Sequence, residues 1–107
     1  MTNPEGPLQV ESSTEDGQLV LVLTGELDPH TAPLLRDRID AALDERTTTL
    51  VLDLRGLRFI DSSGLRVIIG AHKDMVGRDG HLVLRAPTET TRRLLDITGL
   101  VDHLEVD

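Results

Sequence analysis

Two short apolar runs constrain the fold of this chain more than any other feature. The first covers residues 19–24 and reads Leu-Val-Leu-Val-Leu-Thr, and the second covers residues 50–54. Continuous apolar runs of this length are typical of strands that are buried on both faces. The segment between them has apolar residues at helical spacing, which predicts an amphipathic surface helix. Its apolar face consists of Ala32, Leu35, Ile39, Ala42 and Leu43.

The rest of the chain continues this alternation of strands and helices, which requires parallel crossover connections. Asp16-Gly17 is a hairpin turn signal that precedes the first apolar run and makes the sheet mixed. We therefore expect a small single-domain α/β sandwich whose mixed, mostly parallel sheet has four to five strands and is accompanied by three to four helices. The further predicted elements are an edge strand at 9–13, a helix from 61–64 to Val76, a strand at 81–85, a helix at 88–98 and a short closing strand within 100–106.

Glycines mark several predicted boundaries. Gly25 is expected to end the first buried strand, and Gly56 to break the second, so that residues 57–60 lead into a loop. Gly77 is predicted to follow the second helix, and Gly99 to terminate the last one.

Length and composition indicate one domain with an aliphatic core. The chain has 107 residues and a mass of 11.7 kDa, which is the size of one ordinary domain. Residues 1–7 are polar and rich in Pro and Gly, so we predict a disordered tail there and the folded domain at 8–107. Apolar residues make up 38%, and Phe59 is the single aromatic residue.

The charge and the hydropathy pattern argue against several classes of partner. With 11 basic and 19 acidic residues, the net charge is −8, which disfavours both nucleic-acid backbones and anionic lipid. No apolar run approaches the roughly 20 residues of a membrane span. The N-terminal residues lack the basic and apolar segments of a secretory signal. We expect a cytoplasmic protein that binds neither nucleic acid nor membrane.

The residues give no sign of an active site, a cofactor or a metal. The sequence contains no cysteine, no Gly-rich phosphate loop and no G-x-S-x-G motif. None of its histidines is paired at metal-ligand spacing. His72 falls on the apolar face of its helix and is interpreted as a partly buried core histidine. The chain is therefore expected not to be an enzyme, and a hydrolase is the weakest alternative.

The segment that begins the second helix contains a serine with a possible regulatory role. Ser62 lies beside Asp61 in the first helical turn, and the simplest interpretation is that one of the two is the N-cap. A hydroxyl at this position is often exposed, and Gly64 removes a side chain beside it. A phosphate there would face the positive end of the helix dipole and add about −1.5 to −2 charges. This combination suits a switch that changes binding without unfolding the domain.

A second candidate feature is the turn that follows the first buried strand. Asp28 with Pro29 is predicted to begin the first helix, with Asp28 as N-cap and Thr31 as the competing cap. Segments that follow parallel strands and precede helices share one edge of an α/β sheet. If the two apolar strands are parallel, Asp28 and Ser62 lie on the same rim and can form one partner-binding surface.

Three segments carry a resemblance to a known family. Residues 52–65, Leu-Asp-Leu-Arg-Gly-Leu-Arg-Phe-Ile-Asp-Ser-Ser-Gly-Leu, resemble the signature of STAS domains, in particular of the bacterial anti-sigma factor antagonists. Residues 23–28 are similar to the first motif of the family, and residues 93–100 to its C-terminal motif. Three motifs in the right order and at the right spacing make the resemblance fairly specific.

The resemblance implies a function in transcription regulation. Antagonists of this family bind an anti-sigma factor that is also a serine kinase, and the sigma factor is thereby released. The kinase phosphorylates the serine after the motif Asp, which is Ser62 here with Ser63 as the second choice, and a phosphatase reverses the reaction. The resemblance implies no cofactor, and we expect a monomer when free. The implied partner-binding residues are Asp28, Asp61, Ser62, Ser63, Gly64 and Arg66.

Two alternatives to this function remain open at this point. A constitutive STAS interaction module would have the same fold and surface, without phosphorylation of Ser62. A response-regulator receiver would use Asp53 as phosphoacceptor, but it needs an acidic pair after its first strand and a Lys after its last. Here Glu11 is followed by two serines, and Lys73 falls within a helix.

Overall fold

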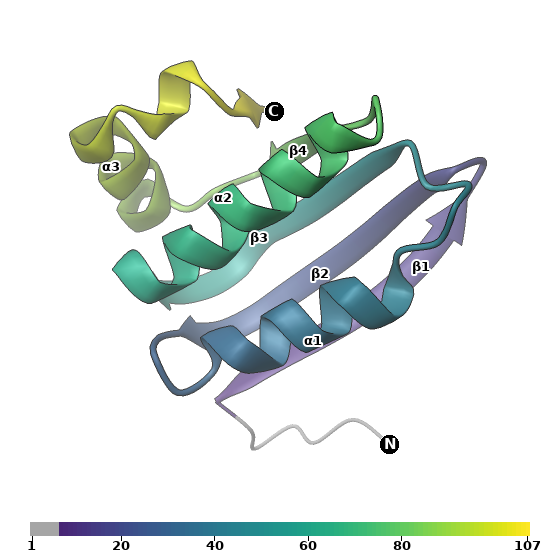
Figure 1. Cartoon of the computed structure of the whole chain (residues 1–107). Helices are drawn as coiled ribbons and strands as arrows, with labels where there is room; N and C mark the ends of the chain where they lie inside the picture. The colour runs from purple at the N-terminus through teal and green to yellow at the C-terminus, as the bar shows by residue number, and fades with distance from the viewer. Residues whose placement is uncertain (1–6) are drawn as a thin grey trace.

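The computed structural model describes residues 7–107, apart from the side chains of Glu15 and Val101. Its strands form one sheet in the order β1-β2-β3-β4-β5, in which β1 is antiparallel to β2 and all other neighbours are parallel (Figure 1). The expected mixed, mostly parallel sheet is thus confirmed. The elements are β1 (Leu8–Glu15), β2 (Gln18–Leu27), α1 (Ala32–Ala42), β3 (Thr49–Ile60), α2 (Ser62–Gly77), β4 (His81–Arg85), α3 (Glu89–Thr98), the 3-10 helix η1 (Leu100–Asp102) and β5 (Glu105–Val106).

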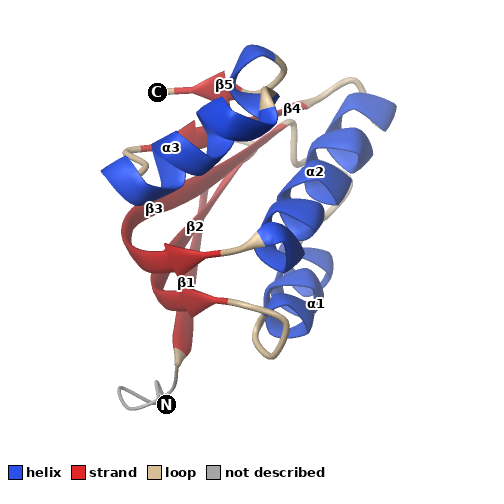
Figure 2. Cartoon of the chain, turned by 90° about the vertical axis from the view of Figure 1, so that its left-hand side faces the viewer, coloured by secondary structure: helices blue, strands red, loops and turns tan. Residues whose placement is uncertain are grey.

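The helices cover the two faces of the sheet unequally. Figure 2 shows α1 and α2 on one face and α3 on the other, where α3 contacts β3. The predicted tail at 1–7 falls on residues outside the described part, except for Pro7. The carbonyl oxygen of Pro7 accepts a hydrogen bond from the amide of Glu26 at 2.7 Å. Among the described residues, no helix is long and apolar enough to cross a membrane.

The hairpin between β1 and β2 forms at the predicted turn. Asp16 has φ = 51° and Gly17 has φ = 80°, and Glu15 is paired with Gln18 across the strands. Two consecutive residues with positive φ match the twist of a two-residue hairpin. The Asp-Gly pair is suited to this turn because both residues tolerate the left-handed conformation.

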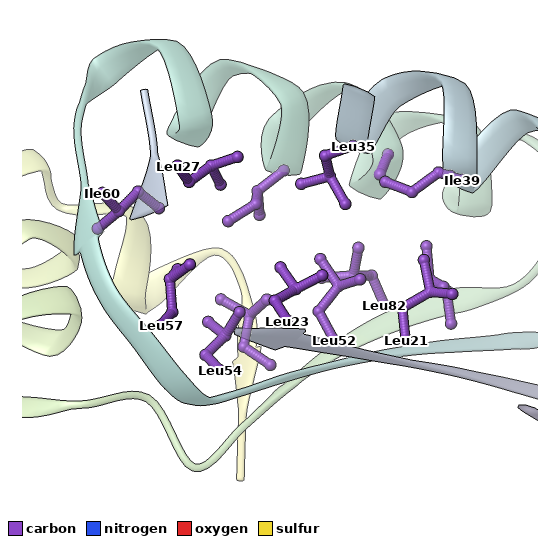
Figure 3. Close-up of a cluster of buried hydrophobic side chains, with 14 of the residues drawn as sticks. Leu21, Leu23, Leu27, Leu35, Ile39, Leu52, Leu54, Leu57, Ile60 and Leu82 are labelled. Atoms are coloured by element: carbon purple, nitrogen blue, oxygen red, sulfur yellow. The ribbon is translucent and has the colours of Figure 1, made fainter. Parts of the chain in front are cut away.

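The core lies mainly between the sheet and helices α1 and α2. Figure 3 shows Leu35 and Ile39 of α1 facing the leucines of β2 and β3. In β2 the burial alternates, so that Leu21 and Leu23 are fully buried while Val22 is 37% exposed. The expectation that β2 is buried on both faces was therefore wrong, because α3 packs on β3 and leaves alternate residues of β2 exposed on that face.

The central strand β3 is buried on both faces over part of its length. Leu50, Val51 and Leu52 are three consecutive residues, and none of them is more than 2% exposed. Neighbouring residues of a strand point to opposite faces, so both faces are covered here. Burial of this segment on both sides was predicted correctly.

Two glycines that were expected to end strands instead allow them to continue. Gly25 has φ = 114°, and a Cβ on it would lie 2.1 Å from the carbonyl oxygen of Pro7. A Cβ on Gly56 would lie 3.1 Å from Oγ1 of Thr24. The β2–β3 register shifts beside both glycines, which accommodates irregular but continuous strands. Figure 3 shows β3 curving upward beyond Leu54.

The start of α2 and both ends of α3 agree with the predictions, whereas the start of α1 and the end of α2 differ from them. Helix α2 begins after Asp61, and α3 begins after Thr88 and ends at Gly99, which has φ = 77°. Helix α1 begins at Ala32, one turn later than the Asp28 start, because Asp28 forms a separate turn described below. Gly77 is the last residue of α2 and not the residue after it.

Candidate functional site

The ends of β2 and β3 bring two turns of the chain together. Leu27 and Ile60 are paired at the last position of the two parallel strands, and the amide of Asp61 donates to the carbonyl oxygen of Leu27 at 3.2 Å. The turn that contains Asp28 therefore lies beside the turn that contains Ser62. Figure 2 shows these two turns leading from neighbouring strands to α1 and α2. The expectation of a shared rim is confirmed.

The start of α2 is organised by the carboxylate of Asp61. Its Oδ1 accepts hydrogen bonds from the amides of Ser63 at 2.9 Å and Gly64 at 3.3 Å, so Asp61 is the N-cap. Ser62 is the first residue of the helix and is exposed, whereas Ser63 is half-buried. Within the described part of the chain, the hydroxyl of Ser62 has no hydrogen-bond partner. The cap thus leaves the Ser62 hydroxyl available to solvent.

Gly64 faces the interior of the domain. It is buried, and a Cβ on it would lie 2.6 Å from Cγ of Leu27 and 3.0 Å from Cγ1 of Ile60. The absence of a side chain therefore lets α2 approach the ends of β2 and β3 closely. Gly64 sets the position of the Ser62 turn and presents little surface of its own.

The Asp28 turn is held by a buried threonine. Oδ1 of Asp28 accepts hydrogen bonds from the amides of His30 at 2.8 Å and Thr31 at 3.0 Å. The Thr31 hydroxyl accepts from the Asp28 amide at 2.9 Å and lies 2.9 Å from the carbonyl oxygen of Glu26, to which it can donate. The hydrogen bond from the Thr31 amide, followed by that from His30, lowers the pKa of Asp28. Asp28 is half-buried and is kept as a carboxylate on the rim.

Sequence reasoning treated Thr31 only as a rival N-cap. It occupies the N-cap position of α1, but its side chain makes no hydrogen bond to the first turn of that helix. Thr31 is 3% exposed and bonds backward to the Asp28 turn. The spacing Asp-x-x-Thr was the available signal, since both side chains are prone to local bonds with the backbone.

A shallow groove runs between α1 and α2 beside this rim. Its volume is about 540 Å³, and it is lined by both apolar residues and two arginines, Arg36 and Arg66. Arg36 forms ion pairs with Asp40 and, at 3.0 Å, with Asp74. Arg66 is exposed and has no ion pair or hydrogen bond within the described residues. Of these two guanidinium groups, that of Arg66 is therefore the one free to meet a partner.

The residues that a receiver domain would use are not assembled at the rim. Asp53 lies in the middle of β3, paired with Val22 and Arg85, and its carboxylate accepts from the amide of Arg55 at 3.0 Å. Ligands of α/β sheets bind beyond the carboxyl ends of the strands. The position of Asp53 thus argues against the receiver alternative.

His72 has the partly buried position that was expected from its helical spacing. The residue is half-buried on α2, and its Nδ1 atom is buried without a hydrogen-bond partner.

Known proteins are similar to this chain over most of its length. The sequence matches the model of the STAS domain over residues 9–107. This chain therefore belongs to the STAS domain family. It is 39% identical over 94 residues to the anti-sigma F factor antagonist of Paenibacillus polymyxa, covering 87% of this chain and 80% of that protein. It is 31% identical over 99 residues to the anti-sigma-B factor antagonist of Bacillus subtilis (strain 168), covering 92% and 90%.

Solved structures with the same fold include anti-sigma factor antagonists. An anti-sigma factor antagonist from Mycobacterium paratuberculosis has a TM-score of 0.83 and 27% identity, covering 99% of this chain and 89% of that one. The unphosphorylated antagonist SpoIIAA has a TM-score of 0.78 and 28% identity, covering 94% and 87%. The phosphorylated Bacillus SpoIIAA has a TM-score of 0.71 and 28% identity, covering 94% and 90%.

Proposed function

We propose that this STAS domain is an anti-sigma factor antagonist that is switched by phosphorylation of Ser62. The observation that carries the proposal is the exposed Ser62 hydroxyl on the first turn of α2, beside the turn of Asp28. Proteins that are similar to this chain over most of its length are named as antagonists of anti-sigma factors. One similar protein, SpoIIAA, has been solved both with and without phosphorylation.

The unphosphorylated rim is the binding-competent form. Asp28, Asp61, Ser62 and Arg66 present polar and charged groups around the end of the α1–α2 groove. An anti-sigma factor that binds there is held away from its sigma factor. This chain contributes a surface and a phosphate acceptor to the reaction, whereas the catalytic groups belong to the partner kinase. A phosphatase restores the binding-competent form.

Phosphorylation weakens binding through charge and not through unfolding. A phosphate on Ser62 adds about −1.5 to −2 charges to a rim that already carries the carboxylates of Asp28 and Asp61. Like charge placed at an interface costs affinity for a partner that fits the uncharged form. The fold tolerates the phosphate because Ser62 is exposed and its hydroxyl makes no hydrogen bond in the described chain.

Ser62 is the preferred acceptor over Ser63. Phosphoryl transfer requires the hydroxyl to enter the active site of the kinase and align with the transferred group. Ser62 is exposed, whereas Ser63 is half-buried, lines the groove and donates its amide to Asp61.

The test is a phosphorylation assay with site mapping. The purified domain is incubated with ATP, with and without lysate of the source organism, and compared with the Ser62→Ala and Ser63→Ala variants. We expect a gain of about 80 Da, one phosphoryl group, on Ser62 only when lysate is present. The gain should persist in Ser63→Ala and disappear in Ser62→Ala.

Two other results of this assay would contradict the proposal. Absence of phosphorylation on Ser62 under several growth conditions would indicate a constitutive interaction module. Phosphorylation with ATP alone would indicate that the chain is itself a kinase.

A further inference from the structure

Ser62 and Arg66 are one helical turn apart on the surface of α2. Both residues are exposed, and their spacing is i, i+4. Side chains at this spacing are neighbours on a helix, and an anionic group N-terminal to a cationic one is the favourable order. A phosphate on Ser62 would therefore come within reach of the Arg66 guanidinium.

Three backbone amides at the start of α2, those of Ser63, Gly64 and Leu65, are already bonded to Asp61. The amides of Ser63 and Gly64 donate to the carboxylate of Asp61. A phosphate on Ser62 could use these amides only by displacing Asp61, which carries a charge of the same sign. The first turn of α2 contains no acidic residue, so Arg66 has no carboxylate partner one turn before it on the helix. A cationic side chain on the same face of α2 is therefore the charged partner that the phosphate can reach without displacing Asp61.

The other charged groups around the rim do not offer an equivalent partner. Asp28 of the β2–α1 turn is anionic, and its carboxylate is occupied by backbone amides. Arg36 of α1 is committed to Asp40 and Asp74. His30 is exposed in the β2–α1 turn and Arg58 is exposed on β3, so neither is held at the i, i+4 spacing on α2 that Arg66 has. Arg66 is without an ion pair in the described residues.

We propose that Arg66 is the counter-ion of phosphorylated Ser62 within the same chain. Before phosphorylation, Arg66 lines the α1–α2 groove, and its guanidinium has no ion pair in the described residues and can meet the partner. After phosphorylation, it pairs with the phosphate. The switch then withdraws a cation from the binding surface in addition to placing an anion there. This inference rests on the proposed function only in naming Ser62 as the modified residue.

The inference can be tested without a kinase or an anti-sigma factor. Phosphoserine is installed at position 62 during translation, by reassignment of a stop codon, and its second ionisation is followed by ³¹P NMR against pH. Arginine stabilises the dianionic phosphate, so Arg66→Ala should move the titration midpoint upward by about half a pH unit. Arg66→Lys should retain part of the effect, since it keeps the charge but not the planar fork.

A matched variant distinguishes the pair from a general charge effect. Lys73→Ala removes the same charge from the same helix, about 16 Å along its axis from Ser62. In Lys73→Ala, the titration midpoint of the phosphate on Ser62 should equal that of the parent protein. Equal midpoints for the parent and Arg66→Ala would overturn the inference, and so would an equal shift in Lys73→Ala. Neither result would bear on whether a cellular kinase modifies Ser62, so failure of the two proposals can be told apart.

Discussion

Gly64 of α2 and Leu27 of β2 are in such close contact that a Cβ on the glycine would lie 2.6 Å from Cγ of the leucine. Leu27 is fully buried, and it is followed directly by the Asp28 turn. The contact therefore fixes the helix that carries Ser62 against the strand that carries Asp28. The Asp28 turn and the Ser62 turn therefore share one support in the core.

Gly64→Ala should destabilise the domain, because the added methyl group must push Leu27 or the start of α2 aside. We expect a loss of roughly 1–3 kcal/mol in the free energy of unfolding, measured by chemical denaturation. Gly77→Ala is the matched control, since a Cβ there meets nothing within 4 Å. It should leave stability unchanged or raise it by up to about 1 kcal/mol. Equal stability of the two variants would contradict the tight contact described here.

Thr31→Ala should loosen the Asp28 turn, because it removes the hydroxyl that bonds to the Asp28 amide and reaches the Glu26 carbonyl. Loss of a buried hydroxyl with two backbone partners should cost about 1–2 kcal/mol of stability. Thr31→Ser keeps the hydroxyl and should recover most of this loss. Denaturation curves of the two variants provide the measurement. If Thr31→Ser were as unstable as Thr31→Ala, the loss would come from the threonine methyl group and not from the hydroxyl.

The Asp28 carboxylate should make stability depend on pH in the acid range. Hydrogen bonds from the Thr31 and His30 amides lower its pKa from the ordinary value of 3.8. A group whose pKa is lowered on folding stabilises the native state at pH values above its ordinary pKa. That contribution is lost as the pH falls through the lowered value.

The substitution Asp28→Asn tests this dependence directly. The stability difference between the parent protein and Asp28→Asn should be largest near neutral pH and should shrink below about pH 4. Thermal unfolding between pH 2 and pH 7 provides the comparison. Asp37→Asn is the control, because Asp37 is exposed on α1 without a partner in the described chain. A difference that stays constant over the whole range would show that the Asp28 charge has no part in holding the turn.

Charge at position 62 should decide affinity for the anti-sigma factor. Ser62→Ala should bind as the unphosphorylated parent does and should not be released by ATP. Ser62→Glu should bind at least about tenfold more weakly, which corresponds to roughly 1.4 kcal/mol. Ser12→Glu places the same charge on exposed β1, away from the rim, and should bind normally. Calorimetric titration measures all three, and parent-like affinity of Ser62→Glu would argue against the switch.

Local sequence signals predicted those parts of the fold that depend on neighbouring residues. The Asp16-Gly17 hairpin and the Gly99 end of α3 formed as expected, and the cap of α2 is Asp61, one of the two residues that the sequence offered for it. Each depends on the conformational preferences of two to four consecutive residues, which do not change with tertiary context. The shared rim also followed, since parallel strands necessarily end at the same edge.

Features that depend on distant parts of the chain could not be predicted in this way. Gly25 and Gly56 look like strand ends in the sequence. Yet Gly25 lies where Pro7 passes too closely for a side chain, and Gly56 lies in tight contact with Thr24 of the neighbouring strand. The one-sided burial of β2 depends on which part of the sheet α3 covers.

The sequence by itself thus determined the order of strands and helices and placed the start of α2 at Asp61 and Ser62, because these features arise from short-range preferences and apolar periodicity. Only the tertiary structure decided that Gly64 faces Leu27, that Thr31 holds the Asp28 turn, and that no described residue forms an ion pair with Arg66. Those relationships depend on how closely separate elements pack and on which side chains other elements already engage. Such distances are set by the folded core and have no local signature in the chain.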